Sequence, residues 1–525
     1  MKRSKFKTIQ SKILVTSFSV IFFLLSGCSD GFLDRQPLDQ VVSTNFYQTE
    51  DDAMKALISV YDAVQYQSSP GISWAPFLTI SDVLSDHSYA GGADANNGIN
   101  EDQLNTFNIL TTNVIVHSLW AKNYTGIYRA NLLLEKIVDI DASEDFKKEI
   151  VAECKFFRAY FYFELVKLFE NIPLLTETIK GPSQYIQTQN EVQEVYNLIA
   201  SDLVEAIDVL PEETMGNNNG KVTKWSAAAL LARAFLFYDG VYGGNLQAAE
   251  VVVDNMKALS YIEELIVSSG HNLIADYNVL FKLESEMGSE SVFEIAHGDS
   301  PAWWDWGYLR GSEGNLAAQM QGPRVTGSDN WNRGWSFAPV TQKLVDAFGD
   351  DPRLNATVLM ESELDGSLVK GYQHTGYFSK KYSSDAEHWG ADGQFEHNRT
   401  ANYRVIRYAD VLLMAAELGS PNAQQYLDEV RSRVGLESIT ATKKNILKER
   451  ELELALEGIR YFDLLRQGLA VATTELNAQS KIGPNYEGDD VIFQVTFNAS
   501  TKGFLPIPQT EVDLSNGTFK QNAGY

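Results

Sequence analysis

The sequence predicts a mainly α-helical protein, in which tetratricopeptide-like pairs of helices form a scaffold for a second, loop-rich and more variable half. Helical periodicity of apolar residues continues from about residue 113 to 260. Between residues 270 and 400 it fades, glycine and aspartate become more frequent, and five of the nine tryptophans fall within residues 303–335. The tetratricopeptide consensus spacing is absent, so this assignment depends on helix pairing and on small residues at the helix contacts.

The helices of the first half are marked by their caps and apolar faces. Thr49 is a typical N-cap residue, and the three acids that follow it suit the first turn of a helix. Residues 152–169 are apolar nearly all round, which indicates a central buried helix that ends before Pro173. Cys154 in this segment is expected to be a small buried hydrophobe. Two more helices are expected, over residues 195–210 and 223–238.

The second half is expected to regain helices after its loop-rich segment, over residues 402–418, 423–434 and 443–467. Within the last of these, the spacing predicts ion pairs from Glu457 to Arg460 and from Asp463 to Arg466.

The N-terminus has the form of a bacterial lipoprotein signal peptide. Residues 1–12 carry five basic and no acidic side chains, and residues 13–25 are almost wholly apolar but too few to span a bilayer. The segment ends in Leu25-Ser26-Gly27-Cys28, which resembles a lipoprotein processing box. We therefore expect residues 1–27 to be removed and Cys28 to be lipidated. A plain secretory signal with an incidental cysteine and an uncleaved anchor are the alternatives.

Charge and cysteine content exclude several classes of function. The formal charge of −26 becomes about −31 once residues 1–27 are removed, and phosphate neutralisation by a nucleic-acid-binding protein needs the opposite sign. Lipidation of one of the two cysteines leaves no intramolecular disulfide and no cysteine-based metal site. A structural Ca²⁺ held by oxygen ligands stays open. No other cofactor is expected.

Two loop regions supply the candidate binding residues. Aromatic rings offer rigid, amphipathic contact area, and polar groups beside them bond hydroxyls. In residues 303–335 such rings lie among glycines and charged residues, and in residues 68–100 they lie among Asp, Asn and Ser. The alternatives are packing of the loop by the tryptophans and turn chemistry by the aspartates. The candidates are Trp303, Trp304, Trp306, Trp331, Arg310, Arg324, Trp74, Asp82, Asp86 and Tyr89.

Motifs spread along the whole mature chain carry a family resemblance. They include Phe32-Leu33-Asp34, Lys155-Phe156-Phe157-Arg158-Ala159-Tyr160, Gly220-Lys221-Val222-Thr223-Lys224, Tyr408-Ala409-Asp410-Val411-Leu412, Gly458-Ile459-Arg460-Tyr461-Phe462-Asp463 and Leu505-Pro506-Ile507-Pro508. In this order, and behind a lipoprotein signal, they resemble the SusD/RagB family of outer-membrane glycan-binding lipoproteins from Bacteroidota. Glu170-Asn171 departs from the family's usual Gly-Asp, and Ala523 from its usual Pro.

The resemblance implies a SusD-like organisation and function. A helical N-terminal region, residues 28–265, and a C-terminal RagB/SusD region, residues 266–525 with the insert at about 270–400, are expected to pack as one unit. The family captures oligosaccharides at the cell surface, without catalysis, for a SusC-like TonB-dependent transporter. We therefore expect a surface-exposed, lipid-anchored outer-membrane protein of nutrient uptake.

Two other functions could use the same scaffold, and each requires a different kind of site. A surface glycoside hydrolase needs two carboxylates on either side of the scissile bond, and the 69 acids of this chain do not exclude such a pair. However, no nucleophile elbow, HExxH motif or phosphate-binding loop is present. A binder of peptides or other nutrients is the second alternative, because helical repeats often bind peptides.

Overall fold

The computed structural model describes residues 46–65, 73, 75–299, 313–390, 396, 398–477, 480–484 and 490–525. The signal segment 1–27 and the lipidation site Cys28 lie outside these residues. So do five of the candidate binding residues, namely Trp74, Trp303, Trp304, Trp306 and Arg310.

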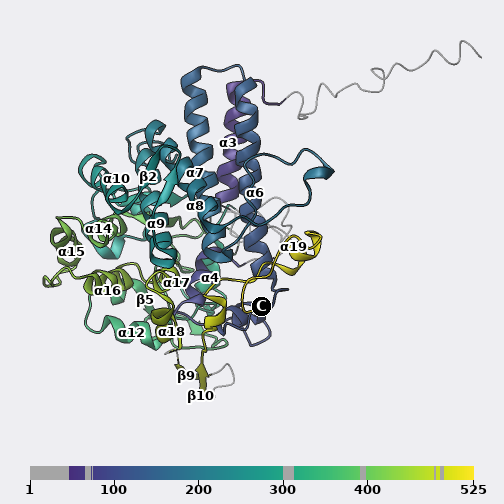
Figure 1. Ribbon diagram of the computed structural model, residues 1–525. Helices are drawn as coiled ribbons and strands as arrows, with labels where there is room; N and C mark the ends of the chain where they lie inside the picture. The colour runs from purple at the N-terminus through teal and green to yellow at the C-terminus, as the bar shows by residue number, and fades with distance from the viewer. Residues whose placement is uncertain are drawn as a thin grey trace, which may run out of the picture.

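Six long helices of the first half pack against one another in chain order. Helices α3, α6 and α7 run side by side, and α8, α9 and α10 each contact the helix before them (Figure 1). Their bounds are Glu50–Gln65 for α3, Val114–Lys136 for α6, Glu144–Phe169 for α7, Val192–Val209 for α8, Lys224–Tyr242 for α9 and Asn255–Ser268 for α10. The predicted scaffold of helical pairs is therefore confirmed.

Caps and close contacts explain why these segments are helices. The side chain of Asn113 accepts hydrogen bonds at the start of α6, and Ser143 does so for α7. Thr223 and Ser226 form a reciprocal capping box on α9. Gly126 on α6 lets α7 approach closely, because a Cβ there would lie 2.3 Å from the ring of Phe161.

The central helix α7 is buried as predicted. From Ile150 onward nearly all its side chains are buried, and Cys154 is a fully buried free thiol. The helix ends at Glu170, whose φ of 59° lies in the region that favours glycine. A glycine, which the sequence resemblance implies at this position, would suit this conformation, so the glutamate here is strained by about 1 kcal/mol.

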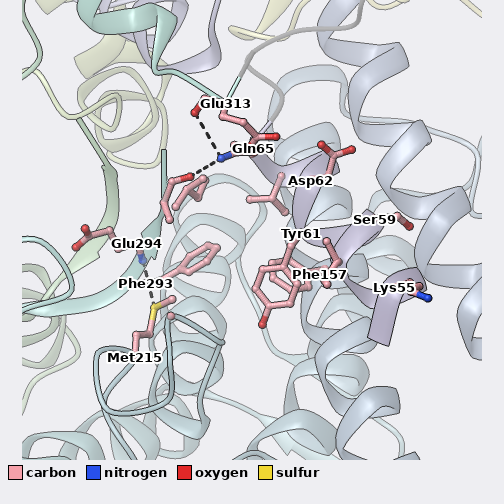
Figure 2. A pocket seen from close by; sticks show the side chains of 15 residues that line it. Lys55, Ser59, Tyr61, Asp62, Gln65, Phe157, Met215, Phe293, Glu294 and Glu313 are labelled. Atoms are coloured by element: carbon pink, nitrogen blue, oxygen red, sulfur yellow. Dashed lines mark hydrogen bonds between the residues drawn. The ribbon is translucent and has the colours of Figure 1, made fainter. Parts of the chain in front are cut away.

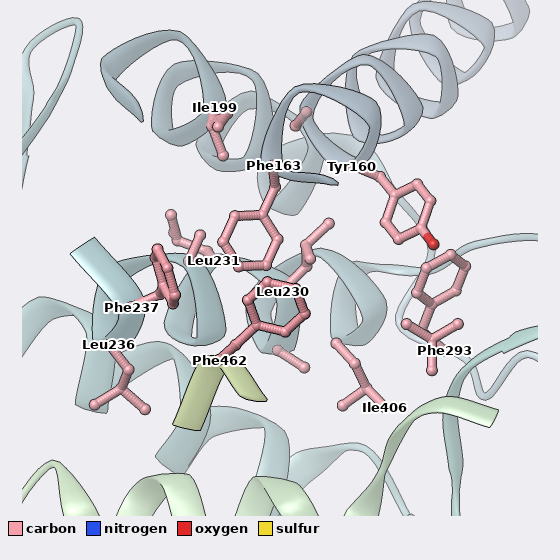
Figure 3. Close-up of a cluster of buried hydrophobic side chains, with 14 of the residues drawn as sticks. Tyr160, Phe163, Ile199, Leu230, Leu231, Leu236, Phe237, Phe293, Ile406 and Phe462 are labelled. Atoms are coloured by element: carbon pink, nitrogen blue, oxygen red, sulfur yellow. The ribbon is translucent and has the colours of Figure 1, made fainter. Parts of the chain in front are cut away.

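The main core joins the two halves of the chain. Phe163 of α7 packs between α9 and the late helix α17, Arg460–Leu465, and its ring lies 6.2 Å from that of Phe237 (Figure 3). Phe462 of α17 contacts the same Phe237 at 6.1 Å. On the other side of this cluster, Phe293 lies 5.4 Å from Tyr160. Burial of each ring contributes about 2 kcal/mol to the stability of the fold, and the contacts among the rings couple the two halves of the chain.

The first half also contains four short elements, namely the helices α4 Phe77–Leu84 and α5 Ile99–Asn105 and the hairpin of β1 Leu246–Ala248 and β2 Val251–Val253. The loop-rich half contains only short elements. Its helices are α11 Leu316–Gln321, α12 Gln342–Phe348, α13 Leu354–Thr357, α14 Tyr408–Glu417, α15 Ala423–Ser432, α16 Lys443–Glu453, α17, α18 Leu469–Asn477 and α19 Gln509–Leu514. Its strands are β3 Ser291–Ile295, β4 Val325–Thr326, β5 Val358–Met360, β6 Ser367–Leu368, β7 Tyr377–Ser379, β8 Tyr403–Arg407, β9 Ser480–Pro484 and β10 Asp490–Gln494. In the described residues these strands form two-stranded antiparallel sheets.

Three predicted segments differ from the structure. The expected loop 68–100 contains α4, and the expected helix 402–418 begins as β8, which pairs with β3. The expected helix 443–467 is broken between α16 and α17 at Leu456 and Gly458, whose φ values are 62° and 76°. There Gly458 N–H donates to the carboxylate of Asp82 at 3.1 Å, a long-range contact that local periodicity does not show.

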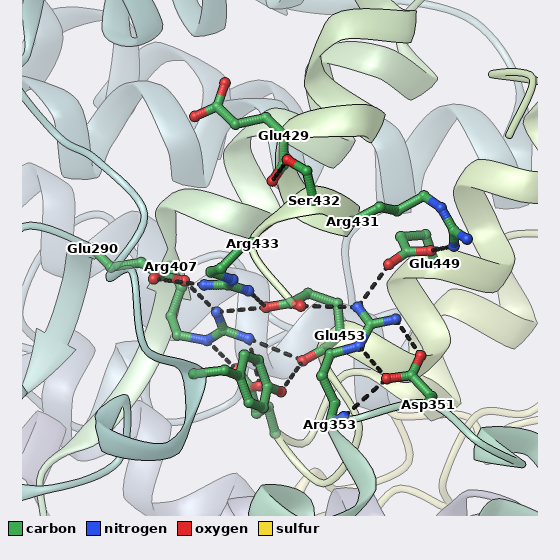
Figure 4. A network of polar contacts seen from close by, with 12 residues as sticks. Glu290, Asp351, Arg353, Arg407, Glu429, Arg431, Ser432, Arg433, Glu449 and Glu453 are labelled. Atoms are coloured by element: carbon green, nitrogen blue, oxygen red, sulfur yellow. Dashed lines mark hydrogen bonds and ion pairs between the residues drawn. The ribbon is translucent and has the colours of Figure 1, made fainter. Parts of the chain in front are cut away.

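A buried ionic network fixes α16 against β8 (Figure 4). The carboxylate of Glu453 contacts the guanidinium groups of Arg353 and Arg407, each at 3.0 Å, and that of Arg433. The predicted pair of Asp463 with Arg466 is present at 2.7 Å. The predicted pair of Glu457 with Arg460 is wrong, because these residues flank the break in the helix. Glu457 instead pairs with Arg407 and Lys381, and Arg460 with Asp86.

Candidate functional site

The two loop regions singled out in the sequence meet at one cavity of about 560 Å³. A short antiparallel contact brings them together, in which Gly92 N–H donates to Ser336 O at 2.8 Å and Ala338 N–H donates to Ala90 O at 3.0 Å. Gly91 permits this approach, since it has a φ of 71° and a Cβ there would lie 2.3 Å from Ser336 O. The cavity is lined by Ser73, Ala75, Ala93, Asn97, Asn100, Glu101, Val114, Ile115, Met320, Arg324, Arg333, Trp335, Phe337 and Glu396.

Trp335 and Phe337 form the aromatic part of the wall. Phe337 is buried beneath the turn that precedes α5, where a Cβ on Gly98 would lie 3.1 Å from its ring. Trp335 is half-buried, and its indole N–H donates to the carboxylate of Glu396 at 3.2 Å. The hydrogen bond orients the indole, so the cavity holds a ring of defined position beside polar groups.

Arg324 brings a guanidinium group with unused hydrogen-bonding capacity. Its Nε is buried and has no hydrogen-bond partner in the described part of the chain. Burial and the neighbouring Arg333 lower the pKa of Arg324, while Asp94 opposes them. A buried donor without a partner is costly, so this geometry favours a ligand that supplies an acceptor oxygen.

Glu101 brings the complementary acceptor. It lies on α5, is only 8% exposed, and is one of the residues that line the cavity. Burial raises its pKa to about 7, against a hydrogen bond from its own backbone N–H. Among the described residues, no ion pair joins this carboxyl to a guanidinium group, and burial outweighs its hydrogen bond.

The charges lining the cavity nearly balance. Arg324 and Arg333 contribute two guanidinium groups, and Glu101 and Glu396 contribute two carboxyl groups. A neutral ligand with many hydroxyl groups matches this arrangement, because each hydroxyl both donates and accepts a hydrogen bond.

The structure distinguishes among the candidate residues predicted from the sequence. Arg324 lines the cavity, whereas Trp331 is half-buried and is not among the lining residues. Asp82, Asp86 and Tyr89 are corrections, since they are 1%, 0% and 1% exposed and their side chains lie inside the protein. Sequence reasoning missed Glu101, Arg333 and Phe337, and it placed Trp335 in the tryptophan cluster without selecting it.

Asp82 and Asp86 connect the first half to α17. Burial raises the pKa of Asp82 to about 8, and its carboxylate accepts from Gly458 N–H. Burial also opposes ionisation of Asp86, yet Arg460, His87 and Lys343 hold its pKa well below the usual range. Its carboxylate forms a bidentate pair with Arg460 at 2.9 and 3.0 Å. These aspartates are therefore structural residues.

Replacing Asp86 with alanine tests this assignment. The change removes the bidentate partner of the buried Arg460, which keeps only the longer contact with Glu451 at 3.4 Å, and we expect the free energy of unfolding to fall by about 3 kcal/mol. Urea denaturation followed by circular dichroism measures the loss. Ligand affinity of the folded fraction is expected to stay within twofold, and a large loss of affinity with unchanged stability would contradict the structural role.

A second cavity of about 380 Å³ lies between α3, α7 and β3 (Figure 2). Its polar groups already have protein partners. Tyr61 donates to Glu153 at 2.5 Å, Asp62 pairs with Arg129 at 2.6 Å, and Gln65 donates to Ala296 O at 2.8 Å. The first cavity retains unused donors and acceptors, so we assign the functional site there.

The described residues show neither a metal cluster nor a membrane span. Among them, no three His, Cys, Asp or Glu side chains gather in a way that would hold a metal ion. In the same part of the chain, no helix is both long and apolar enough to cross a bilayer.

Comparison with known proteins decides the family. The model of the SusD family matches residues 353–525, and a model described as starch-binding associating with outer membrane matches residues 31–236. A solved structure named as a laminarin binding SusD-like protein is 33% identical, with a TM-score of 0.79, over 91% of this chain and 100% of that one. The chain belongs to the SusD family. The description of the second model associates this SusD family protein with the outer membrane.

Other SusD family members cover similar lengths. Surface glycan-binding protein A from Bacteroides thetaiotaomicron, solved in complex with laminarihexaose, is 28% identical with a TM-score of 0.79, over 90% of this chain and all of its own. SusD-like protein P25 from Formosa agariphila is 26% identical over 87% of this chain and 90% of its own. These relatives are named as SusD-like or as binding proteins rather than as enzymes, in agreement with the prediction of a non-catalytic protein.

Proposed function

We propose that this SusD family protein is a cell-surface glycan-binding lipoprotein whose cavity captures a neutral oligosaccharide of the laminarin type. The observation that carries the proposal is the combination, in one cavity, of an oriented indole with two polar groups that keep unused capacity among the described residues. These are the guanidinium of Arg324, whose Nε has no hydrogen-bond partner there, and the carboxyl of Glu101, which accepts only from its own backbone N–H. Two solved relatives with the same fold support the ligand class, since one is named as laminarin binding and the other is in complex with laminarihexaose.

The physical match is specific to sugars. Pyranose rings present C–H groups to an aromatic face and hydroxyls at their edges, which Trp335 and Arg324 would hold. The cavity volume of about 560 Å³ is within the usual range for small-ligand sites. The balanced charges favour a neutral glycan over a polyanionic one, because neither sign is left in excess.

We also propose delivery of the captured glycan to a SusC-like TonB-dependent transporter. The lipoprotein signal that ends at Cys28 supports an outer-membrane anchor, and the family match supports the partnership. Replacing Cys28 with serine is expected to abolish palmitate labelling and to release the protein from the membrane fraction. No cofactor is proposed for capture.

Calorimetry with laminarihexaose tests glycan capture. The mature protein in detergent is expected to bind the hexasaccharide saturably, with one site per chain, and maltohexaose at least tenfold more weakly. Chromatography of the mixture after overnight incubation is expected to show the hexasaccharide intact. Sustained cleavage would favour the hydrolase alternative. If titration with peptides gives a heat of binding and titration with glycans gives none, the peptide-binding alternative would be favoured.

A further inference from the structure

We infer that ionised Glu101 is the acceptor for ligand hydroxyls in the cavity, so that glycan capture is coupled to release of the Glu101 proton. This inference rests on the proposed function, because it assigns the acceptor within the same cavity. It goes further by making affinity depend on pH and by naming the group responsible.

The position of Glu101 supports the role of acceptor. Its side chain is more than nine-tenths buried, yet it lines the cavity. The turn before α5 packs beside the carboxyl group of Glu101, since a Cβ on Gly98 would lie 3.8 Å from Oε2 of Glu101. Apart from its own backbone N–H, no described group donates to its carboxyl. A ligand hydroxyl that reaches the cavity therefore meets an acceptor with unused capacity.

Without a ligand, the described neighbours of Glu101 do not stabilise its ionised form. On the side of α6, the lining residues Val114 and Ile115 are apolar. On α5 itself, Asp102 accepts from the hydroxyl of Tyr372 at 3.4 Å. Asp82 on α4 accepts from Gly458 N–H, and Asp86, just after α4, pairs with Arg460 of α17. The remaining charged groups of the cavity wall and its adjoining turn are Asp94, Arg324, Arg333 and Glu396.

The sign of the coupling follows from the two forms of the carboxyl. The pKa of Glu101 is raised to about 7, so the free protein holds this proton for part of the time near neutral pH. Hydroxyl donors form stronger hydrogen bonds with a carboxylate than with a neutral carboxyl, so the ligand favours the ionised form. Binding therefore lowers the pKa of Glu101 and releases the proton to solvent. Affinity should rise with pH through about 7 and level off above it.

Calorimetric titrations of laminarihexaose between pH 5.5 and 8.5 test the coupling. For the unaltered protein we expect affinity to rise about tenfold from pH 6 to pH 8, as the ionised fraction of Glu101 grows. At pH 7, buffers of different ionisation heat should reveal release of a fraction of one proton. Glu101→Gln should bind more weakly at pH 8 and show a flat profile. Glu177→Gln, an exposed control, should match the unaltered protein.

A ligand-free measurement guards against misfolding of the variant. Because burial penalises the charged carboxyl, Glu101→Gln should unfold at a higher temperature than the unaltered protein at pH 8, and by a smaller margin at pH 5.5. If Glu101→Gln raised the unfolding temperature by the same amount at both pH values, the inference would be overturned. So would a flat or falling affinity profile for the unaltered protein, or the same rising profile in Glu101→Gln. Failure of laminarihexaose to bind at every pH would contradict the proposed function itself.

Discussion

Replacing Trp335 with alanine is expected to weaken laminarihexaose binding at least about thirtyfold, the effect of losing about 2 kcal/mol at a central aromatic contact. The indole lines the cavity and is oriented by Glu396 at 3.2 Å. Its loss removes the stacking face, while the fully buried side chains of the main core, against whose edge Trp335 packs, stay in place. Calorimetry at pH 8 measures the change, and thermal unfolding checks that the fold is kept.

Trp331→Ala is the matched control for this variant. Trp331 belongs to the same loop and is half-buried, but it does not line the cavity. We expect its replacement to change affinity less than twofold. The reverse order of effects would place the ligand near Trp331, as the sequence first predicted, and would contradict the assignment of the cavity.

Replacing Glu453 with glutamine is expected to lower the free energy of unfolding by about 3–5 kcal/mol, because it leaves buried guanidinium groups without a shared carboxylate. Glu453 is fully buried and contacts Arg353, Arg407 and Arg433. Burial opposes its ionisation, but these three arginines hold its pKa well below the usual range. Since that stabilisation is lost only as pH falls through the depressed pKa, the deficit should be the same at pH 8 and pH 5.

Guanidinium chloride denaturation at both pH values measures this deficit. Glu437→Gln is the control, because Glu437 is exposed and is expected to contribute less than about 0.5 kcal/mol. A deficit as small as that of the control would show that the network contributes specificity of packing rather than stability.

The sequence predicted the helical scaffold well, because its determinants are local. Caps such as Ser143 and the apolar run that forms α7 determine helices through neighbouring residues alone. The prediction was wrong where distant contacts decide the backbone. Gly458 breaks the expected last helix because its N–H bonds to Asp82, and residues 403–407 form β8 because β3 pairs with them.

For the candidate site, composition indicated regions rather than single residues. It indicated two loop regions, and the structure joins these at one cavity. The same composition could not separate the buried Asp86, paired with Arg460, from the cavity-lining Glu101, since both are acids in polar sequence. Trp335 offered a usable signal, because it follows Arg333 and Gly334 within the tryptophan-rich loop.

A crystal structure of the protein with laminarihexaose tests the central claim most directly. We predict that the glycan occupies the cavity between residues 73–101 and 320–337, with one sugar ring against Trp335 and hydroxyls within hydrogen-bonding distance of Glu101 and Arg324. Glycan bound in the cavity between α3 and β3, or elsewhere on the surface with this cavity empty, would contradict the account.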